Sequence, residues 1–146
     1  MNKIETTSED ETLSVGKEFS ATLKKNKTNR SLILFLQGDL GAGKTTFTKG
    51  IMLGLEYDGL VKSPTYNLVE IHETQELKIY HFDLYRIKDP YELEEIGIRE
   101  YLEEVNSVCI FEWPENAESL LPKPDFDVNI EHHKNDEPNS RLIAIK

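Results

Sequence analysis

The strongest constraint on the fold is a glycine-rich segment that directly follows an apolar run. Residues 38–45 read Gly-Asp-Leu-Gly-Ala-Gly-Lys-Thr and match the phosphate-binding pattern G-x-x-x-x-G-K-[ST]. The preceding residues 32–36 read Leu-Ile-Leu-Phe-Leu and do not alternate with polar residues, which is typical of a strand buried on both faces of a parallel sheet. A buried strand, a phosphate loop and a helix are therefore expected in succession.

The side chains of this loop suit a nucleoside triphosphate. Its glycines let backbone N–H groups turn inward at a helix N-terminus, where the helix dipole favours negative charge. Lys44 can reach the β- and γ-phosphates, and the Thr45 hydroxyl can ligate Mg²⁺. The alternative is a glycine-rich turn with a solvated lysine. The residues expected to hold the nucleotide are Asp39, Leu40, Gly41, Ala42, Gly43, Lys44, Thr45 and Thr46.

Two carboxylates follow apolar runs and are candidates for the catalytic work. Glu112 comes after Val-Cys-Ile-Phe at 108–111, and Asp83 ends the similar but interrupted run 79–83. Hydrolysis of a nucleotide requires a carboxylate near Mg²⁺ and a group that orders water. We assign Asp83 to Mg²⁺ and Glu112 to positioning water or completing the metal shell, with the two roles open to exchange. For either acid, an ordinary surface ion pair is the competing interpretation.

Thr65 and Trp113 are further candidate site residues. Ser63-Pro64-Thr65 occupies a position where many phosphate-loop proteins keep a segment that senses the γ-phosphate, and Thr65 could reach the metal. A threonine that simply starts a strand is the alternative. Trp113 could pack on the nucleotide, hold Glu112, anchor a partner or fill the core at the sheet edge.

Length and composition predict one soluble domain over residues 1–146. No apolar segment approaches the roughly 20 residues of a membrane helix, and no export signal is visible, so we expect a cytoplasmic protein without a membrane partner. Cys109, the single cysteine, is expected to be a buried apolar residue. The four histidines lack the spacing of a zinc site and are interpreted as surface residues: His72, His81, His132 and His133.

The net charge of −10 is concentrated in one segment. Residues 89–118 hold ten acidic side chains against one base, Arg99. Such a surface would repel a nucleic-acid backbone, which disfavours direct capture of RNA or DNA as the main role. A solvated helix face and a docking surface for a basic partner both remain open.

The remaining patterns predict an α/β fold with a central mixed sheet flanked by helices. Ser8 and Glu11 have the spacing of a capping box at a helix start, and Asp89-Pro90 starts a later helix that Gly97 ends. Expected helices cover about 8–25, 45–54, 90–97, 98–105 and 115–121, and expected strands cover 32–36, 66–71, 77–83, 108–111, 126–130 and 141–145. The strands at 66–71 and 77–83 form a hairpin, and a turn at 138–140 precedes the last strand.

Four stretches together resemble the bacterial TsaE family, also called YjeE. They are 38–46, Ser-Pro-Thr-Tyr at 63–66, His-Phe-Asp-Leu-Tyr-Arg at 81–86 and Glu-Trp-Pro at 112–114, and their order and spacing match from Leu13 to Ile130. The resemblance implies a small P-loop ATPase that uses Mg²⁺. It implies work with the proteins TsaB and TsaD, which make threonylcarbamoyladenosine on tRNA, so that tRNA is met only indirectly. It carries over activity or ligand binding to Lys44, Thr45, Thr65, Asp83, Glu112 and Trp113. The stretch from His132 onward matches no family pattern.

Three other functions are compatible with a phosphate loop. A small-molecule kinase usually clamps the transferred phosphate with an arginine-rich lid, and this function is disfavoured because the chain has just four arginines: Arg30, Arg86, Arg99 and Arg141. A GTPase would need a guanine-reading N-K-x-D motif downstream of the loop, whereas the nearest match, at 26–29, lies upstream and lacks the Asp. A nucleotide-dependent scaffold that does not hydrolyse its ligand stays open.

Overall fold

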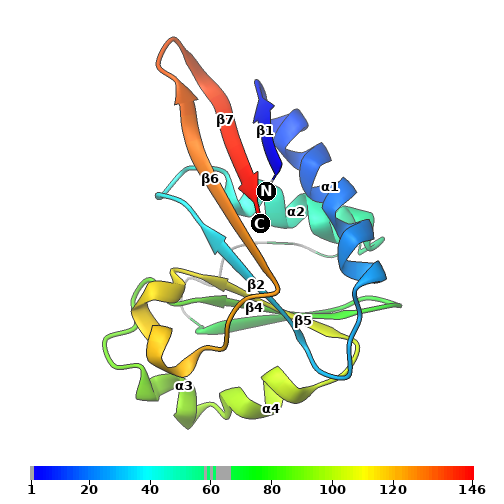
Figure 1. The fold of residues 1–146 in the computed structure, drawn as a ribbon, viewed down its shortest axis with the longest axis vertical. Helices are drawn as coiled ribbons and strands as arrows, with labels where there is room; N and C mark the ends of the chain where they lie inside the picture. Colours follow the sequence, from blue (N-terminus) through cyan, green and yellow to red (C-terminus); the bar gives the residue numbers. More distant parts are fainter. Residues whose placement is uncertain (1, 58, 60, 62–66) are drawn as a thin grey trace.

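Residues 2–57, 59, 61 and 67–146 are described by a computed structural model, in which they form a mixed β-sheet with helices on both faces (Figure 1). Within these residues the sheet has seven strands in the order β1-β7-β6-β2-β5-β4-β3. The strands are β1 (Asn2–Thr6), β2 (Leu32–Gln37), β3 (Val69–Glu73), β4 (Lys78–Asp83), β5 (Ser107–Glu112), β6 (Phe126–Lys134) and β7 (Glu137–Ile145). The helices are α1 (Glu9–Lys25), α2 (Lys44–Gly54), α3 (Tyr91–Glu95), α4 (Ile98–Glu103) and the 3₁₀ helix η1 (Pro114–Leu120). This architecture confirms the predicted fold class.

The central strand β2 is parallel to both of its neighbours. It pairs with β5 on one side and β6 on the other, and β5 in turn runs parallel to β4. The run at 32–36 lacks alternation because Ile33 faces one layer of helices while Leu34 faces the other. The outer pairs β3–β4, β6–β7 and β7–β1 are antiparallel. The carboxyl ends of β2, β4 and β5 therefore meet at one edge of the sheet.

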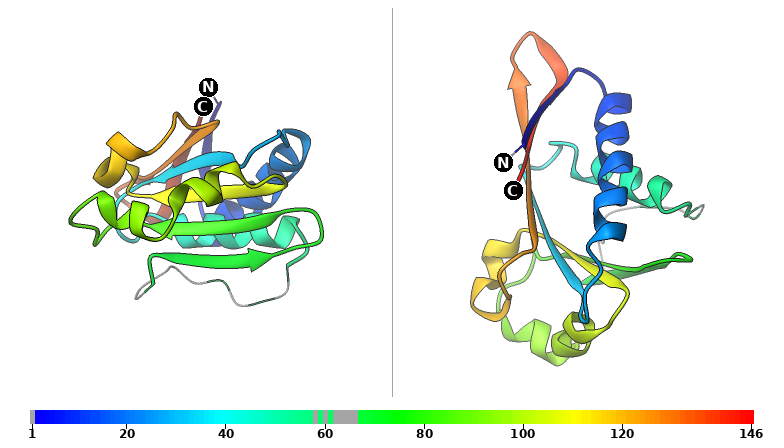
Figure 2. Two further views of the ribbon diagram at one scale, coloured as in Figure 1. Left: turned by 90° about the horizontal axis from the view of Figure 1, so that it is seen from below. Right: turned by 45° about the vertical axis from the view of Figure 1, so that its right-hand side comes forward.

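The two faces of the sheet carry different helices. α1 and α2 pack over the face that contains Leu34 and Ile110, and α3, α4 and η1 cover the face that contains Ile33 and Phe111 (Figure 2). Cys109 is fully buried on the second face, as predicted. Of the helices in the described part of the chain, none combines the length and the apolar character needed to cross a bilayer.

Helices α1 and α2 approach each other closely at glycines of both helices. A Cβ atom added to Gly16 would lie 2.3 Å from the carbonyl oxygen of Phe47, and one added to Gly50 would lie 2.1 Å from that of Leu13. These positions tolerate no side chain while the helix backbones keep their present separation. Because α2 begins with the last residues of the phosphate loop, the contact also fixes the loop relative to α1.

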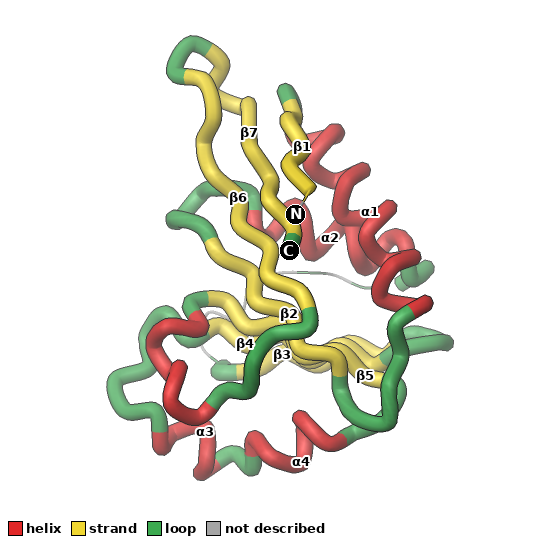
Figure 3. Tube along the Cα trace, in the orientation of Figure 1, coloured by secondary structure: helices red, strands yellow, loops and turns green. Residues whose placement is uncertain are grey.

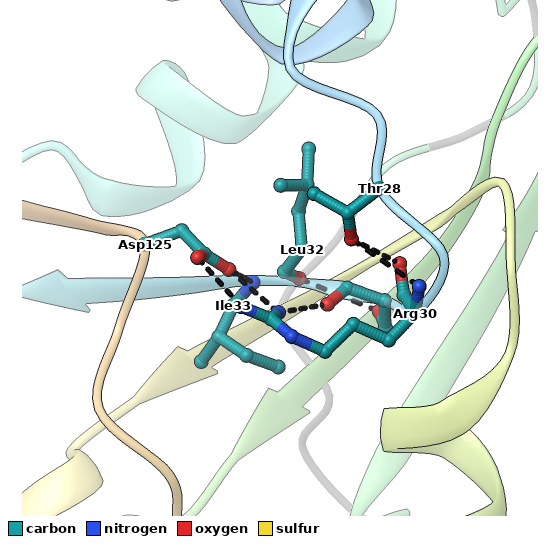
Figure 4. Close-up of polar contacts among 6 residues, drawn as sticks. Thr28, Arg30, Leu32, Ile33 and Asp125 are labelled. Atoms are coloured by element: carbon teal, nitrogen blue, oxygen red, sulfur yellow. Dashed lines mark hydrogen bonds and ion pairs between the residues drawn. The ribbon is translucent and has the colours of Figure 1, made fainter.

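A polar cluster joins the segments that lead into β2 and β6 (Figure 4). The carboxylate of Asp125 accepts hydrogen bonds from both terminal nitrogens of Arg30, each at 2.9 Å, and from the backbone N–H of Ile33 at 2.8 Å. Hydrogen bonds to the charged form lower the pKa of Asp125, with the Arg30 side chain as the largest cause. The cluster aligns β6 with β2, and this alignment carries Ile130 to the phosphate loop.

Most predicted elements are confirmed, with small shifts at their ends. The Ser8 hydroxyl accepts the N–H of Glu11 at 3.1 Å and caps α1. The predicted hairpin corresponds to β3 and β4, although β3 begins at Val69 and residue 66 lies outside the described residues.

At the ends of the chain one strand was missed and one predicted turn is wrong. The first strand, β1, was not expected, and β7 is continuous from Glu137 with its turn at 135–136 rather than at 138–140. Pro138 precedes Arg141, the first residue of β7 that pairs with β1, and it lies beside a ladder irregularity near His132, where a proline is tolerated. The hairpin β6–β7 projects beyond the rest of the sheet (Figure 3).

Candidate nucleotide-binding site

The phosphate loop runs from the end of β2 to the first turn of α2, as the sequence predicts (Figure 1). Gly43, the residue before α2, has a φ of 113°, a conformation that residues with a side chain rarely adopt. At Gly38 an added Cβ would lie 2.5 Å from the carbonyl oxygen of Ile130. Glycine is thus required at Gly43 by backbone conformation and at Gly38 by the close approach of β6.

The loop opens onto a cavity of about 330 Å³, within the size range of small-molecule sites. Parts of the chain that are distant in the sequence line it: the phosphate loop, the carboxyl ends of β4 and β5, and residues of α1 and β7. The predicted residues that line it are Leu40, Gly41, Gly43, Lys44, Thr45, Thr46, Asp83, Glu112 and Trp113. Asp39 and Ala42 instead line a neighbouring cavity that shares Trp113.

Lys44 points its ammonium group into a nearly dry environment. The side chain is 6% exposed, and Nζ lies 3.5 Å from Oε1 of Glu112 and 4.2 Å from the centroid of the Trp113 ring. Among the described residues, Nζ has no hydrogen-bond partner. An ammonium group with three donors, held by one ion pair and one aromatic face, fits a phosphate oxygen as its missing acceptor.

The two predicted carboxylates are adjacent. Asp83 and Glu112 are the last residues of β4 and β5 and lie opposite each other in the parallel pair. Side chains alternate along a strand, and Glu112 shares the face of Val108 and Ile110, which is the face that α2 covers. Burial raises the pKa of Asp83, opposed by a hydrogen bond from the N–H of Tyr85, while the charge of Glu112 raises it further. A bound divalent cation would offset this destabilisation of the charged form.

These oxygens are a suitable donor set for magnesium. Mg²⁺ prefers hard oxygen ligands and is usually held by one or two carboxylates together with substrate phosphates and water. Thr45, Asp83 and Glu112 supply a hydroxyl and two carboxylates to the same cavity. Thr65, the fourth predicted metal ligand, lies outside the described residues and stays a prediction.

Two histidines that were interpreted as surface residues are buried. His81 has no exposed surface, and its Nε2 lies 2.5 Å from Oε2 of Glu112. His72 is 5% exposed, and its Nδ1 lies 3.2 Å from the hydroxyl of Tyr57. The prediction of surface histidines was wrong because it considered only whether their spacing fits a zinc site. A period of two along β4 would have placed His81 on the same face as Asp83.

Trp113 leaves the sheet immediately after Glu112. Its φ and ψ of 57° and 50° are left-handed, a conformation that costs a residue with a side chain about 1–2 kcal/mol. The turn brings the indole over Lys44 and within 5.0 Å of the ring of Tyr85, measured between centroids. The structure thus shows a contact that was not among the four roles considered for Trp113: its ring packs against the ammonium group of Lys44.

Residues near both ends of the chain complete the cavity, and sequence reasoning missed them. They are Glu9 and Thr12 of α1 and Asn139 and Arg141 of β7. Arg141 donates to the carbonyl oxygen of Ala42 at 2.7 Å and to that of Gly41 at 3.3 Å. It therefore ties β7 to two backbone carbonyl groups of the phosphate loop. No sequence signal marks this arginine, because a turn was expected just before it.

Comparison with known proteins identifies the family. Residues 6–143 match the family model described as "Threonylcarbamoyl adenosine biosynthesis protein TsaE". The chain belongs to the TsaE family. Among its relatives, a TsaE protein of Haemophilus influenzae is 48% identical over 132 residues, which cover 90% of this chain and 82% of the relative. A TsaE protein of Bacillus subtilis is 36% identical over 98% of this chain and 85% of the relative.

A solved structure has the same fold. The crystal structure of YdiB from Bacillus subtilis aligns with 99% of this TsaE-family chain and 83% of its own, with a TM-score of 0.72 and 30% sequence identity. The family match also extends past Ile130 to residue 143 and so includes Arg141, in the stretch for which sequence reasoning found no family pattern.

Proposed function

We propose that this protein binds ATP with Mg²⁺ in the cavity beside the phosphate loop and hydrolyses it. Hydrolysis would support repeated turnover of TsaB and TsaD, which transfer the threonylcarbamoyl group to tRNA. Membership of the TsaE family supports a role in the biosynthesis of this modified nucleoside. Because this protein would act together with proteins that modify tRNA, we assign it to the cytoplasm.

The observation that carries this proposal is the convergence of Lys44, Asp83 and Glu112 on one cavity. A glycine-rich loop alone would support nucleotide binding. Two carboxylates at the ends of neighbouring parallel strands, within reach of the loop lysine, add what hydrolysis requires.

Each side chain then has a specific role. Lys44 binds the β- and γ-phosphates, and the hydroxyl of Thr45 and the carboxylate of Asp83 hold the metal. The metal, when bound, neutralises charge that develops on the phosphate oxygens. Glu112 orients the attacking water and accepts its proton, and Trp113, in the wall of the cavity, limits access of bulk solvent.

The charge distribution supports an indirect relation to tRNA. Nine of the ten acidic side chains of residues 89–118 reach the surface, on α3, α4, η1 and the segments beside them, whereas the tenth, Glu112, is buried in β5. Because this surface repels a phosphate backbone, TsaB and TsaD rather than this chain would hold the tRNA.

The test is phosphate release from ATP, measured with and without TsaB and TsaD. We expect slow release from the protein alone and faster release with the partners. Lys44→Ala should abolish ATP binding, whereas Glu112→Ala should keep binding and lose turnover. Lys49→Ala, at an exposed position of the same helix, is the matched control and should behave as the wild type.

Two outcomes would overturn the proposal. Rapid phosphorylation of a metabolite, without dependence on TsaB or TsaD, would favour a kinase. Full tRNA modification in a reconstituted mixture by a variant that binds ATP but releases no phosphate would favour a scaffold.

A further inference from the structure

We infer that His81 is a positioning residue for ATP hydrolysis, because it holds the carboxylate of Glu112 in the orientation that turnover requires. This inference rests on the proposed function, and it adds a role for a residue to which none had been assigned.

The contact between the two side chains is short and completely enclosed. Nε2 of His81 lies 2.5 Å from Oε2 of Glu112, the exposed fraction of His81 is 0%, and that of the Glu112 side chain is 4%. An ionised carboxylate can only accept a hydrogen bond, so Nε2 carries the proton and donates it. Hydrogen bonds to a charged acceptor are stronger than those between neutral groups, and they strengthen further where water is excluded.

The two carboxylate oxygens of Glu112 have different partners. Oε2 is held by His81, which comes from β4, and Oε1 lies 3.5 Å from Nζ of Lys44 in the phosphate loop. With Oε2 fixed, the carboxylate cannot rotate freely about its terminal bond. Oε1 is therefore kept on the side of the cavity, where the water that attacks the nucleotide must be oriented.

Core packing alone does not account for a histidine at this position. His81 shares its face of β4 with Ile79, within the apolar layer under α1 and α2. Among the described residues, the second ring nitrogen, Nδ1, is buried without a hydrogen-bond partner. A methionine or leucine would fill the same space without burying an unpaired polar atom. The feature that distinguishes histidine from these apolar residues at position 81 is therefore its N–H donor at Nε2.

The test compares two substitutions of similar size. In His81→Gln the side-chain amide can still donate near the position of Nε2, whereas His81→Met fills the volume and donates nothing. With TsaB and TsaD present, we expect His81→Met to lower kcat for ATP hydrolysis by roughly 10- to 100-fold, with KM within about twofold of wild type. His81→Gln should recover a large part of kcat.

His72 offers a matched control, since it is the other buried histidine of the β3–β4 hairpin and it contacts Tyr57 rather than a carboxylate. His72→Met should leave kcat near the wild-type value.

A measurement without nucleotide checks the contact itself. In histidine ¹⁵N–¹H spectra of the wild type, His81 should carry its proton on Nε2, with a downfield, slowly exchanging signal that disappears in Glu112→Ala. A wild type that releases no phosphate with its partners would overturn the proposed function. A working wild type would overturn the inference about His81 if His81→Met kept full kcat, if His81→Gln were no better than His81→Met, or if the proton were on Nδ1.

Discussion

Replacing Gly50 with alanine tests whether the contact between α1 and α2 is as close as the structure indicates. In an exposed helix interior this change is favourable by about 1 kcal/mol, since alanine is the better helix former. Here the added Cβ would lie 2.1 Å from the carbonyl oxygen of Leu13 and 3.0 Å from the Cα of Gly16. Both neighbours are backbone atoms, so no side-chain rotation can relieve the clash.

The magnitude follows from the displacement that the clash demands. Reaching an ordinary contact distance requires the helix backbones to separate by roughly 1 Å or more. Overpacking of a well-packed core costs about 1–3 kcal/mol, and a clash between two backbones belongs at the upper end of that range. After subtracting the gain in helix propensity, we expect Gly50→Ala to lower the free energy of unfolding by about 2 kcal/mol. The corresponding decrease in Tm is roughly 4–8 °C.

Urea denaturation followed by circular dichroism measures this change. Ser14→Ala, at an exposed position of α1, is the control and should not reduce stability. Gly16→Ala should resemble Gly50→Ala, and the double variant should lose less than the sum of the two, because one separation of the helices relieves both clashes. If Gly50→Ala were as stable as the wild type or more stable, the packing of α1 on α2 would have to differ from that described.

Three further changes probe other parts of the molecule. Asp125→Asn should lower the free energy of unfolding at pH 7 by about 2 kcal/mol, since it weakens charged hydrogen bonds to Arg30 and Ile33. Because the pKa of Asp125 is lowered on folding, the wild type has this advantage above the ordinary value of 3.8 and loses it as the pH falls below that value, so the two proteins should converge in acid denaturation curves. Arg141→Ala should weaken binding of a fluorescent ATP analogue about tenfold by releasing the loop carbonyls, and an unchanged Kd would exclude that role. Nucleotide should change the fluorescence of Trp113 by drawing Lys44 away from the indole, and a signal unaffected by saturating nucleotide would contradict this geometry.

Local patterns predicted the centre of the fold well. The phosphate loop, the buried strand before it and the acids at the ends of two later apolar runs all depend on short stretches of chain with their own physical signatures. The convergence of Asp83 and Glu112 followed from the rule that parallel strands bring their carboxyl ends to one edge.

The parts that failed depend on contacts between distant segments. β1 is five residues long and mostly exposed, and it is a strand because β7 lies beside it. Arg141 reaches the phosphate loop because β7 inserts between β1 and β6, an order that the sequence does not encode locally. The burial of His81 likewise depends on which strands flank β4 and on the helix that covers its face.

The pairing of Lys44 with Glu112 has a consequence for how charge is handled when a ligand enters. The two side chains form an internal ion pair, so a triphosphate that takes the lysine must leave the carboxylate without its counter-ion. A triphosphate that arrives with a divalent cation supplies both replacements at once, an anion for Lys44 and a cation for the acidic pair. The site thus exchanges ion partners rather than adding net charge, and the free nucleotide should bind less well than its magnesium complex.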